Sequence, residues 1–145
     1  AIKDVCSNRI IGYAIGDRMT TRLATTALRT AIVRREPAGT VVVHSDRGSQ
    51  FRSRAFRREL TAAGLVGSMG RVASAGDDAA MESFFSLLQK NVLNRHTWKT
   101  REDLRVEITI WIEYTYTRRR RQRRLGKLTP TEYELVHHNP QAQAA

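Results

Sequence analysis

The segment Pro37–Val43, which reads PAGTVVV, decides the fold. A helix over residues 20–35, capped by Thr20, is predicted before it, because apolar residues recur there at helical spacing. These apolar residues are Leu23, Ala27, Leu28, Ala31 and Ile32. The proline and glycine end the helix, and Thr40–Val43 is then a short run without polar alternation, which is typical of a strand buried on both faces. A helix, a break and a buried strand in this order indicate an α/β sheet with helical crossovers.

The remaining elements follow from the same periodicity and capping signals. Strands are expected over 1–6, 10–15 and 65–69, with a hairpin turn at 7–9. Helices are expected over 53–63, over 78–93 and from residue 100, with a last capped turn at 128–133, and 70–78 is expected to be a mobile loop. The buried faces of the two later helices are expected to comprise Met81, Phe84, Phe85, Leu88 and Val92, and Leu104, Ile108, Trp111 and Ile112.

Composition indicates one globular domain with a strongly charged partner. The chain has 145 residues, 41% of them hydrophobic, and a formal net charge of +11 from 25 Lys and Arg against 14 Asp and Glu. A basic balance of this size favours nucleic acid as the partner. A ribosome-bound protein, or a basic domain with no nucleic-acid role, remains an alternative at this point.

A single cysteine, Cys6, excludes an internal disulfide and a cysteine-based metal site. One thiol fits a reducing compartment, so a cytoplasmic location is expected. No apolar run approaches the roughly 20 residues that a membrane-spanning helix needs, so no membrane role is expected. The chain begins with AIKDVC, which has neither an initiator Met nor a signal-peptide pattern, and we expect it to begin inside a longer protein.

Two acidic residues form the candidate catalytic pair. Asp46 directly follows the strand that ends near Val43, Glu82 lies near the start of the helix over 78–93, and 35 residues separate them. A carboxylate at the carboxyl edge of a sheet and one on a neighbouring helix can converge in an open α/β fold. Mg²⁺ prefers such oxygen ligands. The spacing alone leaves open that Asp46 only caps a turn and that Glu82 is only a solvated helix residue.

The sequence around the two acids resembles the integrase core domain of insertion-sequence transposases. The resemblance rests on HSDRGSQF at 44–51, AAMESFF at 79–85 and RRLG at 123–126 followed by LTPTEY at 128–133. The 35-residue interval also matches the family's interval between its second and third acidic ligands. The resemblance implies an α/β, RNase H-like mixed sheet flanked by helices, whose first strand is missing here. Residues 1–135 would form the partial catalytic core and 136–145 a flexible tail.

The resemblance also implies the chemistry. Asp46 and Glu82 would be both catalytic residues and metal ligands for two Mg²⁺ ions, or Mn²⁺, which promote phosphodiester cleavage and strand transfer in DNA transposition. The implied partners are transposon-end and target DNA and further copies of the chain, with no small-molecule substrate.

Three positions depart from the family pattern. The family's first catalytic aspartate lies on the missing strand, and Asp4 matches the hairpin turn instead, so this chain alone is expected to be inactive. A basic residue that the family often places seven positions after the glutamate is Gln89 here, with Lys90 next to it. Asp77 and Asp78 replace the usual Asp-Asn, and one of them is expected to cap the helix that follows.

Basic and aromatic residues give the predicted DNA interface, since phosphate contacts position DNA without reading its sequence. The predicted contacts are Arg47, Arg52, Lys90, Arg118, Arg119, Arg120, Arg121, Arg123 and Arg124. Arg118–Arg124 holds six arginines in seven positions, although such a run can also be only a solvated face. Trp98, Tyr114 and Tyr116 are candidates for stacking on unpaired bases, whereas the helical spacing of Trp111 favours the core.

Three other functions remain open from sequence alone. A catalytically inactive transposase remnant that binds DNA is favoured by the missing first aspartate. A stand-alone RNase H-like nuclease would share the same two acids. A ribosome-type RNA-binding protein would share the charge, but the Asp46 and Glu82 motifs argue against it.

Overall fold

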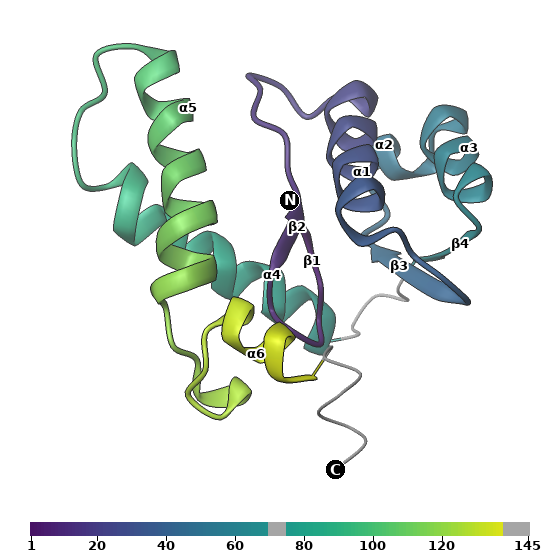
Figure 1. Cartoon of the computed structure of the whole chain (residues 1–145). Helices are drawn as coiled ribbons and strands as arrows, with labels where there is room; N and C mark the ends of the chain where they lie inside the picture. Colours follow the sequence, from purple (N-terminus) through teal and green to yellow (C-terminus); the bar gives the residue numbers. More distant parts are fainter. Residues whose placement is uncertain (70–74, 138–145) are drawn as a thin grey trace. The chain divides into compact units, whose positions relative to one another are not determined.

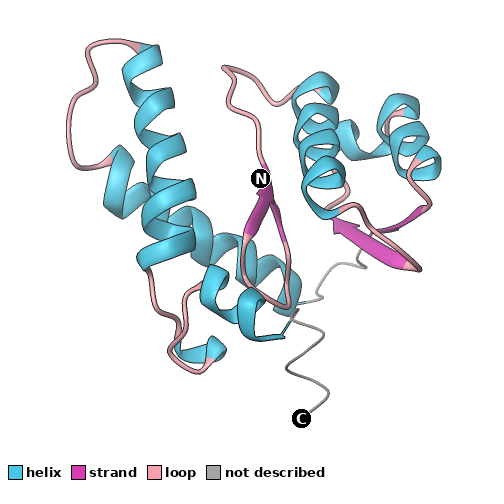
Figure 2. Cartoon of the chain, viewed as in Figure 1, coloured by secondary structure: helices cyan, strands magenta, loops and turns pink. Residues whose placement is uncertain are grey.

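The computed structural model describes residues 1–69 and 75–137, with only the backbone described for 75–78. Helices dominate this part of the chain (Figure 2). The strands are β1 Ile2–Lys3, β2 Ile10–Gly12, β3 Val41–Ser45 and β4 Leu65–Met69. The α-helices are α1 Thr21–Arg35, α2 Ser49–Arg52, α3 Arg54–Ala62, α4 Ala75–Leu88, α5 Arg101–Ile110 and α6 Pro130–His137 (Figure 1). Two π-helical segments, η1 Gln89–Leu93 and η2 Trp111–Arg119, extend α4 and α5, and η3 Arg123–Leu125 is a 3₁₀ turn.

The chain divides into two compact units. The first unit comprises Ala1–Lys3 and Ile11–Glu82, and the second comprises Asp4–Ile10 and Ser83–Ala145. The tip of the N-terminal hairpin therefore belongs with the C-terminal helices, whereas β1 belongs with α1–α3 and the β3–β4 pair.

The first unit is built around α1 and α3, whose sequence-predicted caps are confirmed. The Thr20 hydroxyl accepts a hydrogen bond from the Leu23 N–H at 3.1 Å, and the Ser53 hydroxyl accepts one from the Phe56 N–H at 3.2 Å. These bonds satisfy donors that a helix start would otherwise leave unpaired. The core of this unit contains Ala24, Leu28, Phe56 and Leu60, with Ile2, Ile32, Val43, Phe51 and Leu65 packed against it.

A glycine permits β2 to approach α1 closely. Gly12 is buried, and a Cβ atom at this position would overlap the backbone carbonyl oxygen of Ala27 and the side chain of Ala31. A larger residue would push the strand away from the helix, because neither backbone atoms nor a helical alanine can yield.

The strands form two separate pairs in the described part of the chain, β1 with β2 and β3 with β4. The second pair is parallel, with Val41 opposite Leu65 and Ser45 opposite Met69. The prediction that the Val41–Val43 segment is buried on both faces is wrong for this structure, because Val41 and Val42 are 38% and 58% exposed. A strand paired along one edge within a two-stranded sheet has too few neighbours to be covered on both faces.

Two other boundaries differ from the sequence prediction. α4 begins at Ala75, so Asp77 and Asp78 lie within its first turn and do not precede it as caps. Acidic residues are favoured in a first turn by the helix dipole, which accounts for the earlier start. The expected mobile loop at 70–78 lies outside the described residues for 70–74 and is helical from Ala75. α6 continues through His137, and residues 138–145 of the expected tail lie outside the described residues.

An aromatic cluster forms the core of the second unit. The Phe84 ring is edge-on to Tyr116 with centroids 5.2 Å apart and lies 5.9 Å from Trp111, and Trp111 and Tyr116 are 5.5 Å apart. Leu88 and Val92, one and two turns further along the same helix face, are also buried. The prediction that Phe85 belongs to this face is wrong: its side chain is 49% exposed and packs edge-on against Phe84. One residue is about 100° of helix rotation, which carries Phe85 to the rim.

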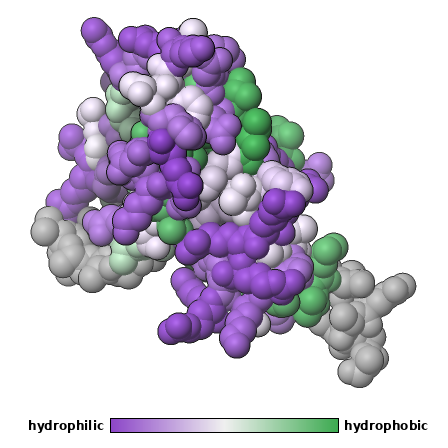
Figure 3. All heavy atoms as spheres, turned by 90° about the vertical axis from the view of Figure 1, so that its left-hand side faces the viewer, coloured by the Kyte–Doolittle hydropathy of each residue, from purple (hydrophilic) through white to green (hydrophobic). Residues whose placement is uncertain are grey.

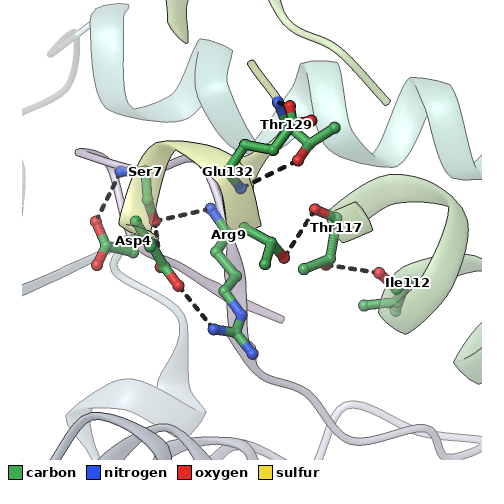
Figure 4. Close-up of polar contacts among 9 residues, drawn as sticks. Asp4, Ser7, Arg9, Ile112, Thr117, Thr129 and Glu132 are labelled. Atoms are coloured by element: carbon green, nitrogen blue, oxygen red, sulfur yellow. Dashed lines mark hydrogen bonds and ion pairs between the residues drawn. The ribbon is translucent and has the colours of Figure 1, made fainter. Parts of the chain in front are cut away.

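Polar contacts fasten the hairpin turn and α6 to the second unit (Figure 4). The Asp4 carboxylate accepts hydrogen bonds from the Cys6 and Ser7 N–H groups at 2.8 and 3.2 Å, which places Asp4 in the turn, as predicted. From this turn the Ser7 hydroxyl donates to Glu134 at 2.8 Å, and Arg9 forms an ion pair with Glu134 at 2.7 Å. Ser7 is fully buried, so this attachment orders the turn tightly.

Two adjacent phenylalanines allow the aromatic cluster to be tested with an internal control. We expect Phe84→Ala to lower the free energy of unfolding by about 3–5 kcal/mol, because it removes a buried aromatic ring and leaves a cavity. Phe85→Ala removes the same atoms from a half-exposed position and should cost far less. Urea denaturation of both variants measures the difference. Equal losses would mean that Phe84 is not the centre of this core.

Candidate active site and nucleic-acid interface

Asp46 lies at the carboxyl end of β3, as the sequence predicts. The strand ends at Ser45, and its parallel pairing with β4 continues to this residue. The Asp46 side chain is exposed, and its Oδ1 accepts a hydrogen bond from the Gly48 N–H at 2.6 Å. Asp46 therefore does cap the turn that leads into α2, as the structural alternative proposed. The bond engages one carboxylate oxygen, which leaves the other able to bind a cation.

Glu82 lies on the exposed side of α4. Phe84, two residues along, is buried in the aromatic cluster, and two residues correspond to about 200° of helix rotation. Glu82, Ser86 and Gln89 are all exposed, which confirms the exposed stripe expected from their spacing. The buried phenylalanine therefore sets the direction in which the Glu82 carboxylate leaves the helix.

The chemistry of these side chains suits a hard divalent cation, but only two carboxylates are available. Asp46 and Glu82 both belong to the first unit and both carry exposed carboxylates. Among residues 1–69 and 75–137, no group of three or more His, Cys, Asp or Glu side chains could hold a metal ion. Mg²⁺ sites commonly use one or two carboxylates together with substrate phosphates, so the donor set fits such an ion in part.

The predicted DNA-contacting residues of the first unit surround Asp46 in the chain. Arg47 and Arg52 are exposed, Arg52 in the last turn of α2. Arg54, Arg57 and Arg58 are exposed on α3, whereas Arg71 lies outside the described residues. Lys90 is exposed on η1 in the second unit. Its neighbour Gln89, at the position where the family often has a basic residue, donates to the Asn94 side chain at 2.6 Å.

The six arginines between 118 and 124 are all exposed, but they differ in their surroundings. The Arg119 guanidinium lies over the Tyr114 ring, 4.5 Å from its centroid. Arg121 forms an ion pair with Glu132 at 3.0 Å and donates to the Lys127 carbonyl at 3.1 Å. The charge of Arg121 is therefore partly compensated within the protein, which makes it a weaker candidate for a phosphate contact than Arg118 or Arg120.

The structure corrects one of the base-stacking predictions. Tyr116 is 2% exposed in the aromatic cluster and is not available to a nucleic acid. Burial raises the pKa of its hydroxyl, against the lowering effects of Gln122 and Arg120. Trp111 is buried beside it, as its spacing predicts. Tyr114 is 48% exposed and Trp98 is half-buried, so these two rings keep an accessible surface.

Sequence reasoning missed the role of the motif LTPTEY at 128–133. Thr129 and Glu132 form a reciprocal cap, with the Thr129 N–H donating to Glu132 at 2.8 Å and the Glu132 N–H donating to the Thr129 hydroxyl at 3.2 Å (Figure 4). The Thr129 hydrogen bond, followed by the charge of Arg121, lowers the pKa of the Glu132 carboxyl. The Thr131 hydroxyl donates to the Thr117 carbonyl at 3.2 Å. The motif thus anchors α6 beside the arginine run.

Comparison with solved structures identifies the fold class. A chain of the simian T-cell lymphotropic virus intasome, determined by cryo-electron microscopy in complex with the PP2A regulatory subunit B56 gamma, matches with a TM-score of 0.61 and 18% identity. The match covers 86% of this chain and 42% of that chain. The predicted α/β, RNase H-like fold class is thereby confirmed.

Comparison of sequences identifies the family. The integrase core domain pattern matches residues 1–75, and a second integrase core domain pattern matches residues 82–136. The chain belongs to the integrase core domain family, as its motifs predict.

Relatives from insertion elements support the same assignment. The IS600 uncharacterized 31 kDa protein and the IS629 transposase of Shigella sonnei are each 36% identical over 137 residues, which is 94% of this chain and 50% and 46% of the relatives. The transposase InsF for IS3A of Escherichia coli K12 is 36% identical over 131 residues, 90% of this chain and 46% of the relative. The chain thus spans about half the length of these relatives. In the described residues, no helix is long and apolar enough to cross a membrane.

Proposed function

We propose that this chain is the greater part of the catalytic core of an insertion-sequence transposase, which cleaves DNA ends and joins them to target DNA. The observation that carries the proposal is the membership of both Asp46 and Glu82 in integrase core motifs, with both carboxylates exposed. We assign residues 1–135 to this core and 136–145 to a tail.

Asp46 and Glu82 would hold Mg²⁺ or Mn²⁺. Two such ions, when bound, supply Lewis-acid stabilisation for an in-line phosphodiester displacement. The protein's own contribution is to present two carboxylates from rigid elements, one at the end of a strand and one on a helix anchored by Phe84. With two acids in the chain, we place the third ligand in sequence that precedes these 145 residues in the longer protein.

The arginines would bind the DNA backbone. Arg47 and Arg52 follow Asp46 closely and would hold the phosphates near the reacting bond. Lys90 and the Arg118–Arg124 run would extend this contact along the duplex, with Arg121 contributing least because Glu132 compensates its charge. Copies of the chain would assemble on paired transposon ends, because joining two ends to one target requires two active sites.

A non-enzymatic role is the second candidate. A protein with the same basic surface but two metal-binding acids would bind DNA, or join intact transposase copies, without turnover. The lack of a third acidic ligand within the described residues favours this role for the 145-residue chain by itself.

Strand transfer separates these two roles. A form extended upstream to the length of the relatives should join a matching DNA end to target DNA in Mg²⁺ or Mn²⁺, whereas the 145-residue form should be inactive. In the extended form, Asp46→Asn and Glu82→Gln should each reduce activity to the level without metal, because the amide is a weaker ligand than a carboxylate. Glu36→Gln, in an exposed acid outside the motifs, is the matched control. Turnover by the 145-residue form, or activity of either site variant, would contradict the assignment.

Salt dependence tests the arginine run. Removing one phosphate-binding side chain should reduce the slope of log affinity against log salt concentration by about 0.9 for duplex DNA. The triple change of Arg118, Arg119 and Arg120 to Ala should therefore flatten the slope clearly. Arg121→Ala should change it less, since Glu132 already pairs with that side chain. Binding of a labelled duplex across a salt series measures both. An unchanged slope in the triple variant would identify the run as only a solvated surface.

A further inference from the structure

An apolar stripe is exposed along the helix formed by α5 and η2. Val106, Ile110 and Tyr114 recur at every fourth position and are each about half exposed, at 49%, 50% and 48%. Figure 3 views the molecule from the left-hand side of Figure 1, where α5 is drawn, and hydrophobic residues show there among hydrophilic ones. The opposite side of the same helix is buried through Ile108, Trp111 and Ile112. The stripe is therefore a second apolar face on a helix whose first is already packed.

The charges along this helix are arranged symmetrically about the stripe. Its N-terminal half carries the exposed acid Glu102, eight residues before Ile110, and its C-terminal end carries the exposed Arg118, eight residues after it. Val106 and Tyr114 lie four residues on either side of Ile110. A second copy of the helix, turned end to end, would therefore place Val106 against Tyr114, Ile110 against Ile110 and Glu102 against Arg118.

We infer that the α5–η2 face binds the same face of a second copy of this chain, antiparallel and with its two-fold axis near Ile110. An interface of this kind is isologous: every contact occurs twice, and one patch must be complementary to itself. The stripe meets that requirement both in its apolar residues and in its charges. The inference deepens the proposed function, because it names the surface through which copies would assemble.

The charges beside the stripe argue against DNA as its occupant. Although the chain has a net charge of +11, the helix from Arg101 to Thr117 carries the four acids Glu102, Asp103, Glu107 and Glu113 against two arginines. Acids at these positions repel phosphates but suit a strongly basic protein partner, which a second copy is. Pairing Glu102 with Arg118 leaves the other arginines of the run for DNA.

Self-association without DNA tests the inference. We expect the 145-residue chain to dimerise in sedimentation equilibrium, and Ile110→Asp to weaken the dimer at least about tenfold, because the change places two like charges at the two-fold axis. Val33→Asp alters another exposed apolar helix residue, on α1, and should leave the dimer unchanged. Circular dichroism checks that both variants are folded. A monomer at all concentrations, or a dimer that Ile110→Asp leaves intact, would overturn the inference.

Charge reversal tests the register. Glu102→Arg alone places arginine against Arg118 of the second copy, and Arg118→Glu alone places glutamate against Glu102, so each should weaken the dimer. The double variant restores opposite charges at both contacts and should recover the original dimer constant to within about twofold. Failure of the double variant to recover would overturn the antiparallel register. Because no DNA is present, these results are independent of whether the chain catalyses strand transfer.

Discussion

The contact of Phe84 with Trp111 and Tyr116 fixes the geometry on which the candidate site depends. These rings join α4 to the α5–η2 helix, and the largest of their centroid separations is 5.9 Å. With Phe84 buried, helix geometry directs Glu82 to the exposed side of α4. A buried aromatic residue two positions along the chain therefore holds an acid that would otherwise have no fixed direction. The same packing buries Tyr116, which removes that ring from any role at the DNA surface.

Local signals in the sequence predicted the caps at Thr20, Ser53 and Thr100, because each depends on residues within one helical turn. Long-range effects were not predictable in this way. The exposure of Val42 depends on which strands flank β3, and the attachment of the hairpin turn to Glu134 joins residues 125 or more positions apart. The candidate acids were found from their motifs and spacing, whereas the capping role of the Asp46 side chain needed the structure to be seen.

The arginine run shows how one charge cluster serves several purposes. Arg121 stabilises the start of α6 through Glu132, and Arg119 covers the Tyr114 ring, whereas Arg118 and Arg120 remain at the surface. Composition alone treats these side chains as equivalent DNA contacts. Their different partners instead predict different contributions, because an arginine already paired within the protein gains less from a phosphate. The local excess of acids along α5 likewise shows that a strongly basic chain can present a face suited to protein partners.

The central claim is that Asp46 and Glu82 act together at one pair of metal ions. Its most direct test is a crystal structure of the protein extended to the length of its relatives, with Mn²⁺ and a cleaved DNA end, in which anomalous scattering locates the metal. The account predicts two ions about 4 Å apart, with oxygen atoms of both Asp46 and Glu82 among their ligands. Metal bound without either carboxylate, or the two side chains on opposite faces of the sheet, would contradict it.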